Sequence, residues 1–179
     1  MKNDIAKILY TEEQLQQRVR EMGAEIARDY EGKNPIMVCI LKGSVIFYGD
    51  ICKYVNIPLK MDFMAVSSYG NEAQTSGNVK IKKDLSESVE GRHVLVVEDI
   101  IDSGLTLKHL RQLLATRNPA SVKVCCLLDK VGAHPAELGG EYSGFPVANE
   151  LVVGYGLDYA EHYRNLPYIG VLKPEVYAD

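Results

Sequence analysis

The sequence predicts an α/β fold: a mostly parallel, twisted sheet flanked by helices, with a small irregular hood over one end. Two patterns support this prediction. Short apolar runs, typical of strands that are covered on both faces, alternate along the chain with segments of helical periodicity. From Val147 onward, glycine and proline interrupt the apolar segments. The first pattern indicates a parallel sheet with helices packed on it, and the second indicates small irregular elements at one end of that sheet.

Each element has its own signal in the sequence. Thr11 and Gln14 have the spacing of a capping box, which predicts the start of a helix. The apolar residues Leu15, Val19, Met22 and Ile26 then recur at helical spacing, so they are expected to form the buried face of that helix. Apolar runs predict strands at residues 36–41, 60–68, 93–97 and 122–128, and helical patterns predict helices at 45–55 and 105–117. Residues 69–78 are polar and predict a long loop.

Length and composition limit the class of protein. With 179 residues, the chain is expected to form one domain, residues 1–179, with hood elements from its N-terminal segment and from about 130–179. It is 46% hydrophobic and 25% charged, as is usual for a globular protein. The formal charge of −4 argues against a nucleic-acid surface spread over the molecule, but it leaves room for a local cationic pocket.

The expected environment is the cytoplasm. No apolar run is long enough to cross a bilayer, and the N-terminal MKNDIAKILY lacks the apolar core of a signal peptide. The cysteines have no CxxC spacing, and three of them lie in apolar stretches, as expected for buried thiols in a reducing compartment. Four scattered histidines give no zinc-site pattern.

The stretch VVEDIIDSGLTL (96–107) carries the chemistry. In an open parallel sheet, ligands bind beyond the carboxyl ends of the strands, which is where Glu98 and Asp99 are expected. A carboxylate pair there can accept hydrogen bonds from a vicinal diol and attract a divalent cation. The following DSGLT offers backbone N–H groups, two hydroxyls and a helix N-terminus, which together suit a phosphate. The turn lacks the Gly-Lys-Ser/Thr ending of a P-loop, so one phosphate beside a ribose is expected.

A plainer interpretation of this stretch is that Asp102 and Ser103 only cap the following helix, while Glu98 and Asp99 are solvated at a strand end. For an isolated D-S-G turn, that interpretation is the better one. For the complete twelve-residue arrangement, the ligand site is favoured.

VVEDIIDSGLTL resembles the 5-phosphoribosyl-1-pyrophosphate (PRPP) motif of the type I phosphoribosyltransferases, which have a Rossmann-like fold. The wider resemblance is to bacterial hypoxanthine-guanine phosphoribosyltransferases. It covers nearly the whole chain through the segments LKGS (41–44), SSYG (67–70), LLDK (127–130), VVGYGLDY (152–159) and YRNLPYIGVL (163–172). The resemblance implies transfer of ribose 5-phosphate from PRPP to hypoxanthine or guanine, which gives IMP or GMP and pyrophosphate, with Mg²⁺ as cofactor.

The resemblance also implies a role for each matching residue. The ribose hydroxyls and Mg²⁺ would be held by Glu98 and Asp99, and the 5′-phosphate by Ser103, Gly104, Leu105 and Thr106. Pyrophosphate would contact Lys42, Gly43 and Arg164, next to a Leu41–Lys42 peptide that can be cis in this family. The purine would contact Lys130, Leu151 and Val152, and Asp158 would lie near the guanine 2-amino group or a second metal. Ser68 and Tyr69 would open a loop that closes over the reactants.

Two of these residues also have a chemical rationale. The purine becomes cationic when its N9 attacks the ribose, so a carboxylate such as Asp102 near N7 can take the proton as general base. An ammonium such as Lys130 only donates, so it favours a 6-oxo group over a 6-amino group and makes adenine a poor substrate. The sequence departs from the family at Leu151, where an aromatic residue usually stacks on the purine.

Several alternatives stay open at this point. Lys42 in a strand-to-helix turn, Lys130 at a strand end and an Asp158–Arg164 ion pair are each common surface features. The chain could be a regulator that senses PRPP without catalysis, or a transferase for another base such as xanthine. A homodimer or homotetramer is expected from the resemblance.

Overall fold

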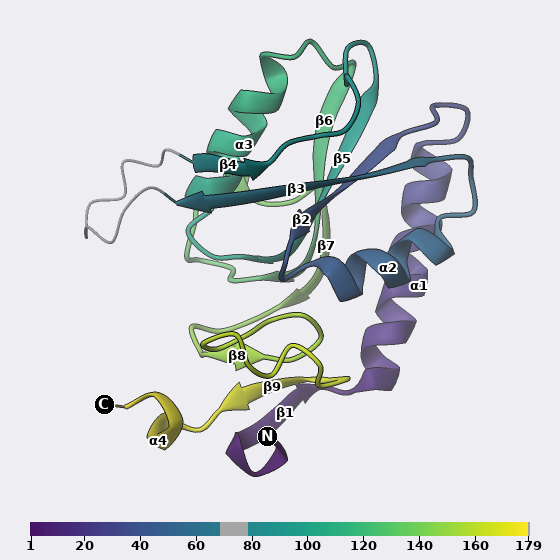
Figure 1. The fold of residues 1–179 in the computed structure, drawn as a ribbon. Helices are drawn as coiled ribbons and strands as arrows, with labels where there is room; N and C mark the ends of the chain where they lie inside the picture. Colours follow the sequence, from purple (N-terminus) through teal and green to yellow (C-terminus); the bar gives the residue numbers. More distant parts are fainter. Residues whose placement is uncertain (69–78, 179) are drawn as a thin grey trace.

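The central sheet of the computed structural model, which describes residues 1–68 and 79–178, has six strands (Figure 1). Their order is β4-β3-β2-β5-β6-β7, and all neighbouring pairs are parallel except β3 and β4. The strands are β2 (Ile36–Leu41), β3 (Lys60–Ser68), β4 (Val79–Lys83), β5 (His93–Ile101), β6 (Ser121–Asp129) and β7 (Tyr142–Pro146). The predicted mostly parallel sheet flanked by helices is therefore confirmed.

Helices cover both faces of this sheet because its strands are apolar on both sides. Alternate residues of β2 such as Met37 and Cys39 share a core with α1 (Glu12–Asp29) and α2 (Val45–Tyr54). Their neighbours such as Ile36 and Val38 pack with α3 (Leu105–Ala115) on the opposite face. The alternation follows from the two-residue period of a strand.

The first helix begins as predicted. Thr11 Oγ1 accepts a hydrogen bond from the Gln14 backbone N–H (3.2 Å), and Gln14 Oε1 accepts one from the Thr11 N–H (2.9 Å). Leu15, Val19 and the rest of the predicted apolar face have no exposed surface. The capping box and the helical face are confirmed.

The hood contains a second, antiparallel sheet in the order β1-β9-β8. Its strands are β1 (Ile5–Tyr10), β8 (Val152–Val153) and β9 (Ile169–Leu172). Figure 1 shows this sheet below the central sheet, beyond the end of β2 at which α2 starts. The hood thus faces the carboxyl ends of the parallel strands, where ligands bind in open α/β sheets.

Some predicted boundaries were wrong. The strand predicted at 93–97 continues to Ile101, because Ile100 and Ile101 extend the ladder with β6. Glu98 and Asp99 therefore lie inside the strand. The helix predicted to reach residue 117 ends at Ala115, and β4 at 79–83 was not predicted. The loop predicted at 69–78 lies outside the described residues. Within the described part of the chain, no helix is long and apolar enough to span a membrane.

Candidate active site

The turn between β5 and α3 is shaped by Gly104. This residue has φ +74°, a left-handed conformation that glycine adopts without strain, and it is the N-cap of α3. A Cβ on Gly104 would lie 2.8 Å from Cβ of Leu138, so the turn packs closely on the segment after β6. The side chain of Ser103 accepts a long hydrogen bond from the Leu105 N–H (3.4 Å). Asp102 does not cap the helix, so the interpretation of this residue as an N-cap is wrong.

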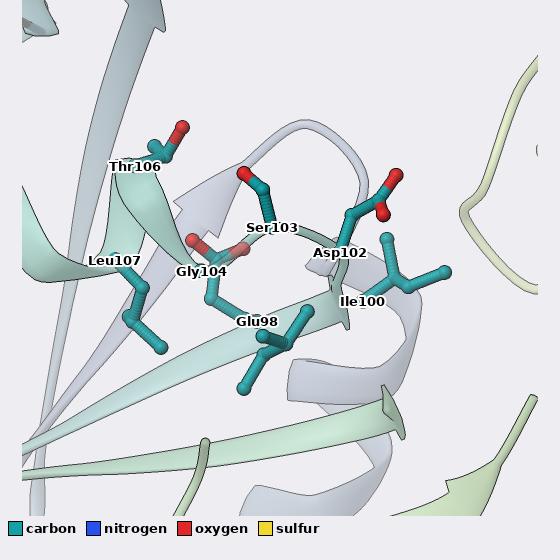
Figure 2. Close-up of a pocket in the computed structure, with 8 residues that line it drawn as sticks. Glu98, Ile100, Asp102, Ser103, Gly104, Thr106 and Leu107 are labelled. Atoms are coloured by element: carbon teal, nitrogen blue, oxygen red, sulfur yellow. The ribbon is translucent and has the colours of Figure 1, made fainter. Parts of the chain in front are cut away.

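A first cavity of about 120 Å³ lies over this turn. It is lined by Glu98, Ile100, Ile101, Asp102, Ser103, Gly104, Thr106 and Leu107. Figure 2 shows the Ser103 and Thr106 hydroxyls pointing to the same side of the turn, with the Glu98 carboxylate beside Gly104. Polar groups from a strand, a turn and the first turn of a helix thus converge on one small space.

A second cavity, of about 210 Å³, lies between the turn and the hood. It is lined by Asp99, Ile100, Asp102, Lys130, Glu150, Leu151, Val152, Leu157 and Asp158. Ile100 and Asp102 line both cavities, so the two spaces adjoin at this point. Glu98 and Asp99 belong to different cavities because successive residues of a strand point to opposite sides.

Lys130 and Asp102 form an ion pair at the boundary between the cavities. Lys130 Nζ lies 3.0 Å from Asp102 Oδ2. The Lys130 side chain is 14% exposed and that of Asp102 is 63% exposed. A cationic donor and a carboxylate thus sit side by side, one largely covered and the other open to an incoming ligand.

The predicted 41–44 loop reaches the same site. The Leu41–Lys42 peptide is cis, one of the two forms that the resemblance left open. A Cβ on Gly43 would lie 1.8 Å from Oδ2 of Asp99, so the Asp99 carboxylate occupies the space that a side chain would take. On the other side, a Cβ on Gly156 would lie 2.1 Å from the Gly43 carbonyl oxygen. The loop is therefore packed between β5 and the hood by contacts that only glycine permits.

A cluster of charges borders this loop. Arg164 contacts Asp158 Oδ1 (3.1 Å) and Glu161 Oε1 (3.1 Å), and it donates to the Gly156 carbonyl (2.8 Å). Lys42 Nζ lies 2.9 Å from Glu161 Oε2. The structure thus contains the Asp158–Arg164 ion pair that was considered from the sequence. Glu161 bridges the two cations and was not predicted from the sequence. Its position three residues from both Asp158 and Arg164 could have indicated that it joins this cluster.

Comparison with known proteins shows which family has this sequence and fold. Residues 6–160 match the family model described as phosphoribosyl transferase domain. The hypoxanthine-guanine phosphoribosyltransferase of Bacillus subtilis is 53% identical over 177 residues, which cover 99% of this chain and 98% of that protein. The chain belongs to the phosphoribosyltransferase family.

Within this family, the chain groups with the hypoxanthine-guanine phosphoribosyltransferases. A crystal structure of a hypoxanthine phosphoribosyltransferase from Staphylococcus aureus superposes with a TM-score of 0.96 at 47% identity, covering 100% of this chain and 97% of that one. The bifunctional protein TilS/HprT of Listeria monocytogenes is 57% identical over 179 residues. The match covers the whole of this chain but only 28% of the length of that relative.

Two adjacent carboxyl groups of this phosphoribosyltransferase, those of Glu98 and Asp99, have raised pKa values. Burial raises the pKa of Glu98 well above its usual value, and the adjacent Asp99 adds to the effect. Burial also raises the pKa of Asp99, and the nearby Arg164 partly opposes this rise. Two neighbouring acids with raised pKa values form a site that a cation stabilises.

The remaining predicted residues lie around the second cavity or outside the described part. Leu151 and Val152 line it from the hood, where β8 is an edge strand paired with β9. Ser68 ends β3, and Tyr69 lies outside the described residues. In the described ranges, no group of three acidic, histidine or cysteine side chains is arranged as a metal site.

Proposed function

We propose that the chain transfers 5-phosphoribosyl from PRPP to hypoxanthine or guanine, giving IMP or GMP and pyrophosphate. The observation that carries this proposal is the pair of adjoining cavities that meet at Asp102. A nucleoside monophosphate has a phosphate, a sugar and a base in a row. The first cavity suits the phosphate, and the second suits the base, so the sugar lies at their junction.

The first cavity would hold the 5′-phosphate. The α3 helix starts at Leu105, so its free backbone N–H groups and its positive end face that cavity. Ser103 and Thr106 add hydroxyl donors, and Gly104 lets the backbone bend close to the ligand. Glu98 and Asp99 would accept hydrogen bonds from the ribose hydroxyls.

The second cavity would hold the purine. O6 and N7 are neighbours on one edge of a 6-oxopurine, and Lys130 and Asp102 are neighbours on the wall. Lys130 would donate to O6, and Asp102 would take the proton from N7 as N9 attacks the ribose. Leu151 would cover the ring with apolar surface, and Val152 would pair with the base through its main chain. An adenine amino group would face the ammonium of Lys130, so adenine should be rejected.

Lys42, Gly43 and Arg164 would bind pyrophosphate, since a guanidinium presents two parallel donors to a phosphate. Glu98 and Asp99 would help to hold Mg²⁺, and Asp158 would lie near a second metal. The hard carboxylate oxygens of Glu98 and Asp99, whose pKa values are raised, fit this ion, and Mg²⁺ is usually bound by one or two carboxylates together with substrate phosphates. When bound, the ion would neutralise the charge of the departing pyrophosphate.

Other expectations stay predictions. They are closure of the loop opened by Ser68 and Tyr69, one domain over residues 1–179, a cytoplasmic location, and a homodimer or homotetramer. The loop has a physical purpose, because water would capture the oxocarbenium-like centre in an open site.

An assay with radiolabelled bases tests the proposal. The protein is incubated with PRPP, Mg²⁺ and hypoxanthine, guanine, xanthine or adenine, and nucleotide formation is measured. We expect rapid transfer to the two named bases and little to adenine. In Asp102→Asn, kcat should fall about 10²- to 10⁴-fold, the usual contribution of a general base. Binding of PRPP without transfer to any base would instead support a regulator, and a preference for xanthine would change the substrate.

A further inference from the structure

The segment after β6, residues 130–139, lines the second cavity and packs against the turn under the first. Its first residue, Lys130, lines the second cavity. Its residue Leu138 packs against Gly104 in the turn under the first cavity. The segment begins with a tight turn in which the Ala133 N–H donates to the Lys130 carbonyl (3.0 Å). Its conformation therefore influences both the base pocket and the phosphate turn.

The His134 side chain links this segment to Asp129, the last residue of β6. Its Nε2 lies 2.7 Å from Asp129 Oδ1, and its Nδ1 lies 2.9 Å from the Pro135 carbonyl oxygen. The side chains of His134 and Asp129 are 5% and 13% exposed. A carbonyl and a carboxylate can only accept hydrogen bonds, so both ring nitrogens must donate. A ring with two N–H groups is the imidazolium cation.

We propose that His134, as a cation, is a positioning residue that holds segment 130–139 closed and so places Lys130 beside Asp102 and Leu138 beneath Gly104. This inference rests on the proposed function, in which Lys130 binds the base. His134 touches neither cavity and acts through these two neighbours.

The charges around His134 favour the cation. The Pro135 carbonyl and the Asp129 carboxylate raise its pKa, and the carboxylate of Asp102 adds to the effect. From α3, Arg111 reaches the same segment at the Gly139 carbonyl (2.8 Å), but its charge is paired with Glu141 (2.9 Å).

Deprotonation would open this contact. A neutral imidazole has one N–H, so one of its nitrogens would present a lone pair to an acceptor oxygen. A largely buried polar contact would then become repulsive, and the segment would lose its attachment to Asp129 at the end of β6. Base binding should weaken as the pH rises through the titration of His134. The transfer reaction should continue, but a smaller fraction of the enzyme would have the base bound.

Two measurements on the full chain test this. Nitrogen-15 NMR of the histidine rings reports the protonation of His134 directly. Steady-state kinetics between pH 6 and 8.5 give KM for hypoxanthine in the wild type and in His134→Arg and His134→Gln. His109→Gln, in α3 and outside both cavities, is the matched control.

We expect both nitrogens of His134 to carry protons at pH 7. The wild-type KM should rise about tenfold, which corresponds to about 1.4 kcal/mol, with the same midpoint as the NMR titration. His134→Arg keeps a permanent cation and should remove the pH dependence at low KM, whereas His134→Gln should show a raised KM already at pH 6.

A neutral His134 ring at pH 7 would overturn the inference, as would wild-type and His134→Arg profiles that coincide. If the wild type transferred no base at all, the proposed function would fall, and the NMR spectrum would still decide whether His134 is the cation.

Discussion

Lys130 and Asp102 directly follow two different strands, β6 and β5, and Lys130 Nζ lies 3.0 Å from the Asp102 carboxylate. Their main chains are joined as well, because the Lys130 N–H donates to the Ile101 carbonyl (3.0 Å). Asp102 therefore has a fixed partner directly after β6. The ammonium that would recognise the base also orients the carboxylate that would take its proton.

Replacing the ammonium should weaken recognition of 6-oxopurines. In Lys130→Gln, we expect kcat/KM for hypoxanthine to fall about 10- to 150-fold, because a hydrogen bond to a charged group contributes about 1.5–3 kcal/mol. The ratio of adenine to hypoxanthine turnover should rise. Initial rates with both bases measure this, and Lys82→Gln on the exposed side of β4 is the control. An unchanged ratio would mean that Lys130 does not read the 6-position.

Adding an aromatic ring at the hood should improve base binding. Leu151→Phe should lower KM for hypoxanthine about fivefold, since a stacked ring contributes about 1 kcal/mol beyond its buried area. Leu151 lines the cavity beside Val152, so the ring has access to the base. Saturation curves for hypoxanthine provide the test. A KM that stays the same or rises would count against this placement of Leu151.

Removing the acid between Lys42 and Arg164 should favour pyrophosphate binding. The Glu161 carboxylate contacts both cations, so a diphosphate bound by them would have to displace it. In Glu161→Gln, we expect KM for PRPP and the inhibition constant of pyrophosphate to fall about two- to fivefold, the range of an exposed ion pair.

Product-inhibition kinetics measure both constants for Glu161→Gln. Glu87→Gln removes another exposed pair, with Lys60 (2.8 Å), and should leave both constants as they are. Weaker binding of pyrophosphate in Glu161→Gln would show instead that this acid supports the site.

The contact between Gly43 and Gly156 should tolerate no side chain. Gly156→Ala would place Cβ 2.1 Å from the Gly43 carbonyl oxygen, and Gly156 also has φ +105°. We expect a loss of stability above the roughly 1–2 kcal/mol of left-handed strain, together with a raised KM for PRPP. Gly91→Ala is a matched control, because Gly91 has φ +69° with no atom within 4 Å of the added Cβ. Denaturant unfolding measures the stability of each variant, and PRPP saturation curves measure its KM. If Gly156→Ala and Gly91→Ala lost the same stability, the steric clash with Gly43 would be excluded.

The parts of the fold that could be predicted have local signals. The apolar run of β2, the capping box at Thr11 and the stretch 96–107 each depend on residues close in sequence. The length of β5 was underestimated because acids are uncommon inside a buried strand, although Ile100 and Ile101 continue its pairing with β6.

The contacts that were missed are mostly between distant residues. Glu161 meets Lys42 across 119 positions. His134 is near Asp129 in the sequence, but its double contact depends on a tight turn without periodicity. Neither relationship follows from hydrophobic spacing, because each depends on how loops are folded against a completed sheet.

The order β1-β9-β8 has a consequence for the growing polypeptide. Within the described residues, β9 is the strand that pairs with both β1 and β8, so it joins the hood together. On the ribosome, β1 emerges before Ile169–Leu172 and gains this neighbour only when those residues follow. The nascent parallel sheet can form first, but the hood sheet cannot be completed over its carboxyl edge until residues 169–172 have emerged.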